Sequence, residues 1–124
     1  MSFYVYGLRL KGDLECRYIG QTGKAPEDRL IDRIRQSRHH VKIGYCAHPD
    51  GLSQWVAANA DNIEVFRIAK TETRQEARAT ERVIIALVLR LGHRLLNLEG
   101  VPPEQQIGWT HRRWTEPQKE KVPA

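Results

Sequence analysis

Two tyrosine-bearing runs near the start of the chain could carry proton-transfer chemistry. Tyr4 and Tyr6 lie in the first run and Tyr18 lies in the second. A polar Lys-Gly-Asp turn at 11–13 separates them and has a length that suits a β-hairpin. Such a hairpin would bring Tyr6 and Tyr18 close together. A tyrosine hydroxyl near a metal ion can accept a proton from an attacking water, although two tyrosines that only pack in a core would give the same pattern.

A carboxylate further along the chain is the second candidate for chemistry. If its surroundings are helical, Glu81 lies in an apolar row with Ala77, Ile84, Ile85 and Val88. That row should face the core, where a carboxylate is costly unless a cation or a hydrogen-bond donor meets it. Glu81 is therefore half of a structural pair with an arginine, a carboxylate at the rim of the core, or a ligand of a hard metal ion such as Mg²⁺.

The first part of the chain predicts a hairpin followed by a helix. The stretch 3–20 is rich in β-branched and aromatic residues, as strands prefer, and the glycine-flanked segment 20–23 should end the second strand. Pro26 fits the first position of a helix, which we expect at about 26–38. The stretch 39–50 is typical of a loop, with a strong turn signal in His-Pro-Asp-Gly.

The second part of the chain predicts a short helix at 53–60, a third strand at 63–68 and a long helix. Thr73 and Glu76 have the spacing of a capping box at the start of that long helix, and Gly92 is a natural stop. The order of elements predicts an α+β fold, in which a small three-stranded antiparallel sheet is flanked by helices.

Composition limits the kind of protein this can be. The chain has 124 residues, 40% of them hydrophobic and 28% charged, which fits one domain with a modest core. A net charge of +5 favours an acidic partner such as nucleic acid, although many small basic proteins bind none. The apolar run 83–89 is much shorter than the ~20 residues of a membrane span, and the N-terminus lacks a signal-peptide pattern. Because Cys16 and Cys46 form no disulfide framework, we expect a reducing, cytoplasmic location and no membrane.

A group of metal-ligating residue types follows the first predicted helix. His39, His40, Cys46 and His48 could together bind a soft metal ion. Their spacing, however, fits no standard zinc module. The alternative is a polar loop whose histidines lie near a helix C-terminus, where their positive charge is tolerated.

The stretch 109–114 near the C-terminus is basic and aromatic. Trp109 or Trp114 could stack on nucleic-acid bases while Arg112 and Arg113 pair with phosphates. A hydrophobic cap on the core is an equally good interpretation of the two tryptophans. The sequence alone leaves both possibilities open.

The tyrosine runs also resemble a known signature. Tyr4-Val5-Tyr6, a gap of eleven residues and then Tyr18-Ile19-Gly20 are similar to the two signature strands of the GIY-YIG nuclease family. The second half matches letter for letter, whereas Tyr4 stands where the family usually has glycine. The resemblance implies a nuclease-like domain over 1–98, followed by a basic and aromatic extension over 99–124.

The resemblance further implies an active site. Arg29, nine residues after Gly20, matches the family's arginine on the first helix, and Asn97 matches an asparagine after the glutamate helix. Glu81 matches the single glutamate that holds one Mg²⁺ or Mn²⁺ ion. The implied catalytic set is Tyr6, Tyr18, Arg29, Glu81 and Asn97.

Each implied residue has an expected role. Tyr6 would be the base or would position the water, with Tyr18 as its partner at the phosphate. Arg29 would neutralise charge in the transition state, and Asn97 would brace the site. Gly20 would allow close approach of the substrate. Lys24, Arg33, Arg112 and Arg113 are the further expected substrate-binding residues; of these, Arg33 departs from the histidine or other polar group that many members carry.

The activity implied by the resemblance is metal-dependent hydrolysis of DNA phosphodiester bonds, which leaves 5′-phosphate and 3′-hydroxyl ends. The rival interpretation is a catalytically inactive nucleic-acid-binding module on the same fold. The sequence has no zinc-finger or helix-turn-helix pattern after the nuclease-like part. Target choice is therefore left to the site itself or to a partner protein, and DNA is not distinguished from RNA.

Overall fold

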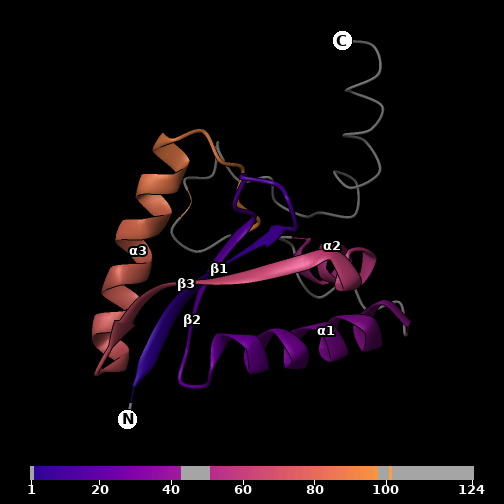
Figure 1. Cartoon of the computed structure of the whole chain (residues 1–124), viewed down its shortest axis with the longest axis horizontal. Helices are drawn as coiled ribbons and strands as arrows, with labels where there is room; N and C mark the ends of the chain where they lie inside the picture. Colours follow the sequence, from indigo (N-terminus) through magenta and orange to yellow (C-terminus); the bar gives the residue numbers. More distant parts are fainter. Residues whose placement is uncertain (1, 43–50, 98–100, 102–124) are drawn as a thin grey trace.

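Three antiparallel strands form the sheet at the centre of this α+β fold (Figure 1). The structure is a computed structural model that describes residues 2–42, 51–97 and 101. β1 (Phe3–Leu10) is the middle strand, with β2 (Tyr18–Thr22) on one side and β3 (Ile63–Thr71) on the other. The predicted fold class is therefore confirmed, and β2 is an edge strand.

Helices cover both faces of this sheet. α3 (Arg74–Arg90) lies on one face, and α1 (Pro26–Lys42) and α2 (Leu52–Ala58) lie on the other, as Figure 1 shows. A short 3₁₀ turn, Ala60–Asn62, joins α2 to β3. Among the described residues, no helix is both long and apolar enough to cross a membrane.

The alternation of side chains along β1 divides the core into two parts. Val5 points to the α3 side, whereas Tyr6 and Leu8 point to the α1 side. The buried cluster on the α3 side contains Val5, Cys16, Ile19, Ala77, Ile85, Leu95 and Val101. The buried cluster on the α1 side contains Tyr6, Leu8, Leu52, Val56, Ile63 and Leu96.

The long helix α3 begins and ends as the sequence predicts. The Thr73 hydroxyl accepts a hydrogen bond from the backbone N–H of Glu76, and the Glu76 carboxylate accepts one from the backbone N–H of Thr73. This reciprocal pair satisfies two backbone donors that the first turn of a helix leaves open. Gly92 has a φ of 91° just after the helix, a conformation that favours glycine.

The other helices and the third strand differ from their predicted bounds. α1 continues to Lys42 instead of ending near residue 38, so His39 and His40 belong to a helix and not to a loop. Neither proline nor glycine interrupts this stretch, and its basic residues suit the negative end of the helix dipole. β3 continues to Thr71, three residues beyond the predicted end. The predicted turn at 48–51 lies largely outside the described residues.

The connection between β1 and β2 is longer than the predicted Lys-Gly-Asp turn. Seven residues, 11–17, connect β1 to β2. The chain turns at Lys11 and Gly12, where Gly12 has a φ of 81°. The backbone N–H of Cys16 then donates to Nδ1 of His93, at 2.8 Å, across a large separation in sequence. The loop is therefore shaped by residues beyond α3, which a local turn pattern does not reveal.

Gly20 does not end the second strand; it lies inside β2 and pairs with Tyr6 of β1. A Cβ atom at Gly20 would lie 2.7 Å from the ring of Tyr18 and 2.8 Å from the hydroxyl oxygen of Tyr6. Glycine is needed here because the two tyrosine side chains occupy the space above its backbone. The strand ends at Thr22, within the predicted segment 20–23, but Gly20 itself is part of the strand and is explained by packing against the tyrosines.

We expect Gly20→Ala to destabilise the protein by about 1–3 kcal/mol, because the added methyl group must displace one of the tyrosines. Urea unfolding measures this change. Gly23→Ala is the matched control, since its Cβ would meet the Phe3 ring at an ordinary 3.4 Å. Equal unfolding midpoints for the two variants would contradict the packing role of Gly20.

Candidate functional site

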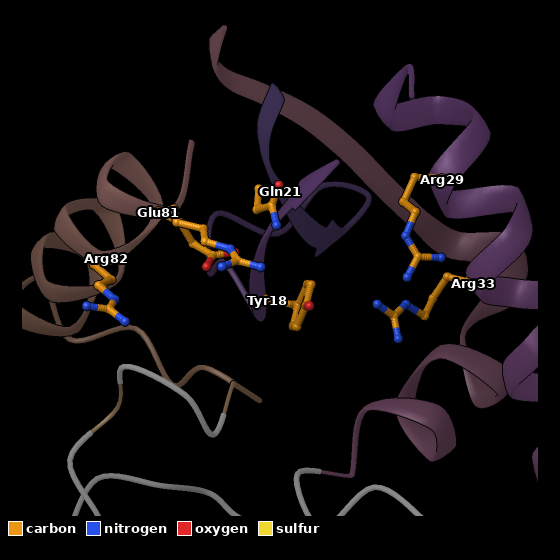
Figure 2. A pocket seen from close by; sticks show the side chains of 7 residues that line it. Tyr18, Gln21, Arg29, Arg33, Glu81 and Arg82 are labelled. Carbon is orange, nitrogen blue, oxygen red and sulfur yellow. The ribbon is translucent and has the colours of Figure 1, made fainter. Parts of the chain in front are cut away.

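A pocket of about 420 Å³ opens at the β2 edge of the sheet, between the helix layers. Figure 2 shows Arg29 and Arg33 reaching into it from α1, and Glu81 on α3 at the opposite side, with Tyr18 and Gln21 of β2 between them. The seven residues that line the pocket are Tyr18, Gln21, Arg29, Arg33, Arg78, Glu81 and Arg82.

β2 supplies the floor of this pocket from both of its faces. Tyr18 packs with the cluster on the α1 side, whereas Gln21 lies on the opposite face of the strand. The Gln21 side-chain oxygen is buried and accepts no hydrogen bond from any described residue. A buried acceptor of this kind is uncommon unless a ligand or an ion completes it.

α1 supplies one wall of the pocket with Arg29 and Arg33. The two residues are four positions apart, so they project from the same side of the helix. The Arg33 guanidinium lies 5.6 Å from the centre of the Tyr18 ring, and its proximity to Tyr6 lowers the pKa of that hydroxyl against the effect of burial. Arg33 therefore links the pocket wall to both tyrosines. This contact follows from having an arginine at a position where many family members carry a histidine or another polar group.

α3 supplies the opposite wall with Arg78, Glu81 and Arg82. Ala77 and Ile85 of the predicted apolar row are buried in the core, as expected. Glu81 itself is only half-buried and lines the pocket. Its carboxylate lies at the rim of the core because the sheet ends at β2, which leaves space instead of side chains beside this turn of α3.

Tyr6 and Tyr18 are neighbours, as the hairpin predicts, with ring centres 6.3 Å apart. Only Tyr18 lines the pocket, since Tyr6 is 2% exposed and lies beneath it. Burial raises the pKa of Tyr18 to about 12, with the neighbouring Tyr6 adding to the effect. Burial also raises the pKa of Tyr6, although Arg33 and Arg29 oppose this. Both hydroxyls are thus protonated at neutral pH and can donate hydrogen bonds.

Asn97 braces the floor of the pocket from behind. Its Oδ1 accepts a hydrogen bond from the backbone N–H of Ile19 at 3.0 Å, and its Nδ2 donates to the Ile19 carbonyl at 2.7 Å. Asn97 is buried and does not line the pocket. Asn97 therefore holds β2 at Ile19, and any effect of Asn97 on the pocket must act through this strand.

The remaining predicted residues lie elsewhere. Lys24 is outside the pocket, where its ammonium group pairs with Asp32 at 2.6 Å. Gly20 is covered by the tyrosines and is not exposed to a substrate. Arg112, Arg113, Trp109, Trp114, Cys46 and His48 lie outside the described residues, as does the 99–124 extension apart from Val101, which is buried in the core.

Three pocket residues were not predicted from the sequence. Gln21 belongs to the segment that was expected to end a strand. Arg78 lies three positions before Glu81, so helical spacing could have placed it beside that carboxylate. Arg82 follows Glu81 directly, a spacing at which helix side chains do not face each other. Nothing in the sequence indicates that this side of α3 faces a hollow, because the hollow exists only where the sheet ends.

The pocket has donors that fit a hard divalent cation. Glu81, the Gln21 amide oxygen and the Tyr18 hydroxyl are oxygen ligands, which Mg²⁺ and Mn²⁺ prefer, and one carboxylate with waters and phosphate is a usual arrangement for Mg²⁺. The described residues contain no group of three or more His, Cys, Asp or Glu side chains that could form a metal cage. Glu81 is the one carboxylate of a lining with four arginines, so an ion held there would need further ligands from water or a bound substrate.

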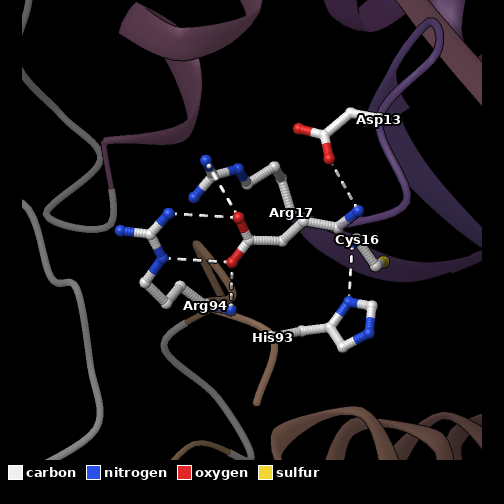
Figure 3. A network of polar contacts seen from close by, with 6 residues as sticks. Asp13, Cys16, Arg17, His93 and Arg94 are labelled. Carbon is white, nitrogen blue, oxygen red and sulfur yellow. Dashed lines mark hydrogen bonds and ion pairs between the residues drawn. The ribbon is translucent and has the colours of Figure 1, made fainter. Parts of the chain in front are cut away.

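The segment that carries Asn97 is itself anchored to the β1–β2 connection (Figure 3). The Glu15 carboxylate accepts hydrogen bonds from the Arg94 backbone N–H at 3.0 Å and from the Arg94 guanidinium at 3.1 Å, and Arg17 lies 3.2 Å away. These contacts, the hydrogen bonds from Arg94 first, lower the pKa of Glu15 to about 2. The charged form of Glu15 thus stabilises the segment behind the pocket.

No family model, curated protein or solved structure matches this chain. The resemblance to the GIY-YIG family therefore rests on the residues of this chain alone. The features that the structure contributes independently are an α+β fold, a polar pocket at a sheet edge and the side chains that line it. Any function assigned to the pocket must be argued from those side chains.

The lowered pKa of Glu15 predicts a pH-dependent contribution to stability. Glu15→Gln should lower the free energy of unfolding at pH 7 by about 1–3 kcal/mol, the usual range for a charged hydrogen bond. Because the folded-state pKa is about 2 and the usual value is 4.5, this difference should persist above pH 4.5 and disappear between pH 4.5 and 2. Chemical unfolding across this pH range measures it, with the exposed Glu72→Gln as control. A difference that stays constant down to pH 2 would contradict the assignment.

Proposed function

We propose that this protein is a metal-dependent endonuclease of the GIY-YIG type, which hydrolyses DNA phosphodiester bonds. One observation carries the proposal: Tyr18, Arg29 and Glu81, far apart in the sequence and selected there by their place in the family motif, line the same pocket. Three surface residues without a shared role would have no reason to converge in this way. The convergence supports a common task for the three side chains.

The charge of the pocket lining supports a phosphate ester as substrate. Four arginines and one glutamate line it, so it attracts anions. Guanidinium groups bind phosphate oxygens in a bidentate manner, and such bonds are strong because both partners are charged. Arg29 is the arginine that we assign to the developing negative charge at phosphorus, where a preorganised donor lowers the barrier most.

The tyrosines would act as donors and positioning groups. Tyr18 lines the pocket with a protonated hydroxyl, which can donate a hydrogen bond to a phosphate oxygen or orient a water. Tyr6 lies beneath and contacts Arg33, so its effect on the substrate would pass through that guanidinium. Tyr6 is therefore a positioning residue in this proposal. The proposal does not require Tyr6 to act as the base, the role expected from the sequence.

A divalent ion, one Mg²⁺ or Mn²⁺, would be held by Glu81 with the Gln21 oxygen nearby. Such an ion supplies Lewis acidity towards phosphate oxygens and stabilises a leaving oxygen. Asn97, through Ile19, keeps β2 and hence both floor residues in place. A DNA substrate, a partner protein for targeting and a cytoplasmic location belong to the same proposal.

The second candidate function is a nucleic-acid-binding module without catalysis. The observation that favours it is the position of Arg33, whose positive charge lies near the Tyr6 side chain where many family members have a histidine or another polar group. Both tyrosine hydroxyls are protonated at neutral pH. A pocket with four arginines and no proton acceptor other than Glu81 among its ionisable lining residues could hold a phosphate without cleaving the ester.

Glu81→Gln separates these possibilities in one assay. If Glu81 holds the metal ion, the variant should lose cleavage of plasmid, flap and single-stranded DNA at every Mg²⁺ or Mn²⁺ concentration. Its melting temperature should stay close to that of the wild type, because an amide at a half-buried helix position costs less to bury than a carboxylate. Affinity for DNA in a chelator should be unchanged or slightly higher, since a negative charge near the phosphate is removed.

The control for this assay is Glu72→Gln, which removes an exposed carboxylate outside the pocket. A Glu81→Gln protein that is strongly destabilised yet still cleaves DNA would show that Glu81 is a structural partner and not a metal ligand. Wild-type protein that binds every substrate but cleaves none with either metal ion would decide for the binding module.

A further inference from the structure

We propose that Arg78 and Arg82 on α3 bind a second backbone phosphate, next to the phosphate held by Arg29 and Arg33 on α1. The substrate would then be one strand that crosses the pocket from one helix to the other and presents two successive phosphates. The inference rests on the proposed function in one respect, namely that the pocket receives a nucleic-acid backbone.

The arginines form two pairs on opposite walls. Arg29 and Arg33 are four residues apart on α1, and Arg78 and Arg82 are four residues apart on α3. Residues at this spacing lie on the same side of a helix, so each wall presents two guanidinium groups to the pocket. In Figure 2, Arg29 and Arg33 lie on one side of Tyr18, and Arg82 lies on the other side, beyond Glu81.

The pocket lining carries more positive charge than one phosphodiester group can neutralise. Several arginines elsewhere on the surface pair with carboxylates, as in Arg9–Glu64, Arg67–Glu27 and Arg94–Glu15. In the pocket four arginines share Glu81 as their one lining carboxylate. A single phosphodiester carries one negative charge, so a second phosphate on the α3 side balances the lining better than one phosphate does.

The polar atoms on the α1 side indicate where the first phosphate would lie. The Nε of Arg33 is buried and donates to no described residue, while its guanidinium already contacts both tyrosines. This donor and the Tyr18 hydroxyl face the α1 half of the pocket. In Figure 2, Glu81 stands between Arg82 and Tyr18, so Arg82 lies on the far side of this carboxylate from Arg29 and Arg33.

The size of the pocket favours a single strand. A volume of about 420 Å³ lies at the low end of the ~300–1,000 Å³ that small-molecule pockets span. Such a hollow accepts a segment of one backbone, whereas a duplex is much wider. Because arginine–phosphate contacts carry no base information, the inference concerns the number of phosphates and not their sequence.

The test uses two short single-stranded DNA probes without terminal phosphates, in a chelator so that nothing is cleaved. A dinucleotide carries one phosphate and a trinucleotide carries two. Calorimetric titration at several salt concentrations should show tighter binding of the trinucleotide by wild-type protein. The slope of log K against log salt should also be steeper for the trinucleotide by about 0.7, the value for one further phosphate contact on a single strand.

Arg78→Gln with Arg82→Gln should abolish this preference, so that the trinucleotide binds with the affinity and the salt slope of the dinucleotide. Both positions are exposed on a helix and glutamine is a comparable helix former, so the fold should persist. Arg78→Lys with Arg82→Lys should keep the salt slope. The charge-matched control is Arg35→Gln with Arg90→Gln, which removes one exposed arginine from each of the same helices outside the pocket.

Three results would overturn the inference. The glutamine pair could weaken both probes by the same factor, which would indicate only a general electrostatic contribution. It could also behave like the control pair, which would restrict the pocket to one phosphate. If Arg29→Ala and the glutamine pair both leave binding unchanged, the pocket does not receive a backbone and the proposed function fails with the inference. Loss of the trinucleotide preference in a protein that never cleaves DNA would support the inference and overturn only the nuclease.

Discussion

The hydrogen bonds between Asn97 and Ile19 are the contact on which the candidate site depends most. An edge strand exposes backbone N–H and C=O groups that no neighbouring strand satisfies. The Asn97 side chain satisfies both groups of Ile19, as a further strand would. The backbone N–H of Leu96 also donates to the Arg17 carbonyl, at 2.6 Å. The segment after α3 therefore replaces a fourth strand and leaves room beside β2 for the pocket.

This arrangement explains why polar chemistry can exist beside a small core. The two apolar clusters lie on opposite faces of the sheet, and each is sealed by its own helix layer. At the β2 edge, side chains of α1 and α3 line the same pocket beyond the last strand of the sheet. Side chains from α1 and α3 can meet there, and the glycine at position 20 allows the tyrosines to pack closely over the strand that supports them.

The sequence predicted local features well and distant contacts poorly. The elements and the α+β class could be predicted from strand periodicity, the Thr73 capping box and Gly92. Each of these signals depends only on residues close together in the sequence. The length of the β1–β2 connection could not be predicted, because it depends on a hydrogen bond to His93, which is far away in the sequence. The extent of α1 was underestimated because the stretch 39–42 contains neither proline nor glycine to stop the helix.

The candidate site shows the same division. Motif order selected Tyr18, Arg29 and Glu81, which do line one pocket. It could not select Arg78 and Arg82, whose importance depends on the sheet ending beside α3. Lys24 is basic and near the motif, yet it pairs with Asp32 in the second turn of α1 and does not line the pocket. Position in a motif thus predicts which residues meet, and the sheet edge decides which others join them.

Side-chain NMR of the arginines tests the central claim, a phosphate-binding pocket between α1 and α3, most directly. The Nε–Hε signals are followed while a single-stranded oligonucleotide is added in a chelator. The signals of Arg29, Arg33, Arg78 and Arg82 should shift together and saturate at one affinity, whereas those of the exposed Arg35 and Arg90 should stay nearly unchanged. Equal shifts for all six arginines, or no shift for the four in the pocket, would contradict the claim.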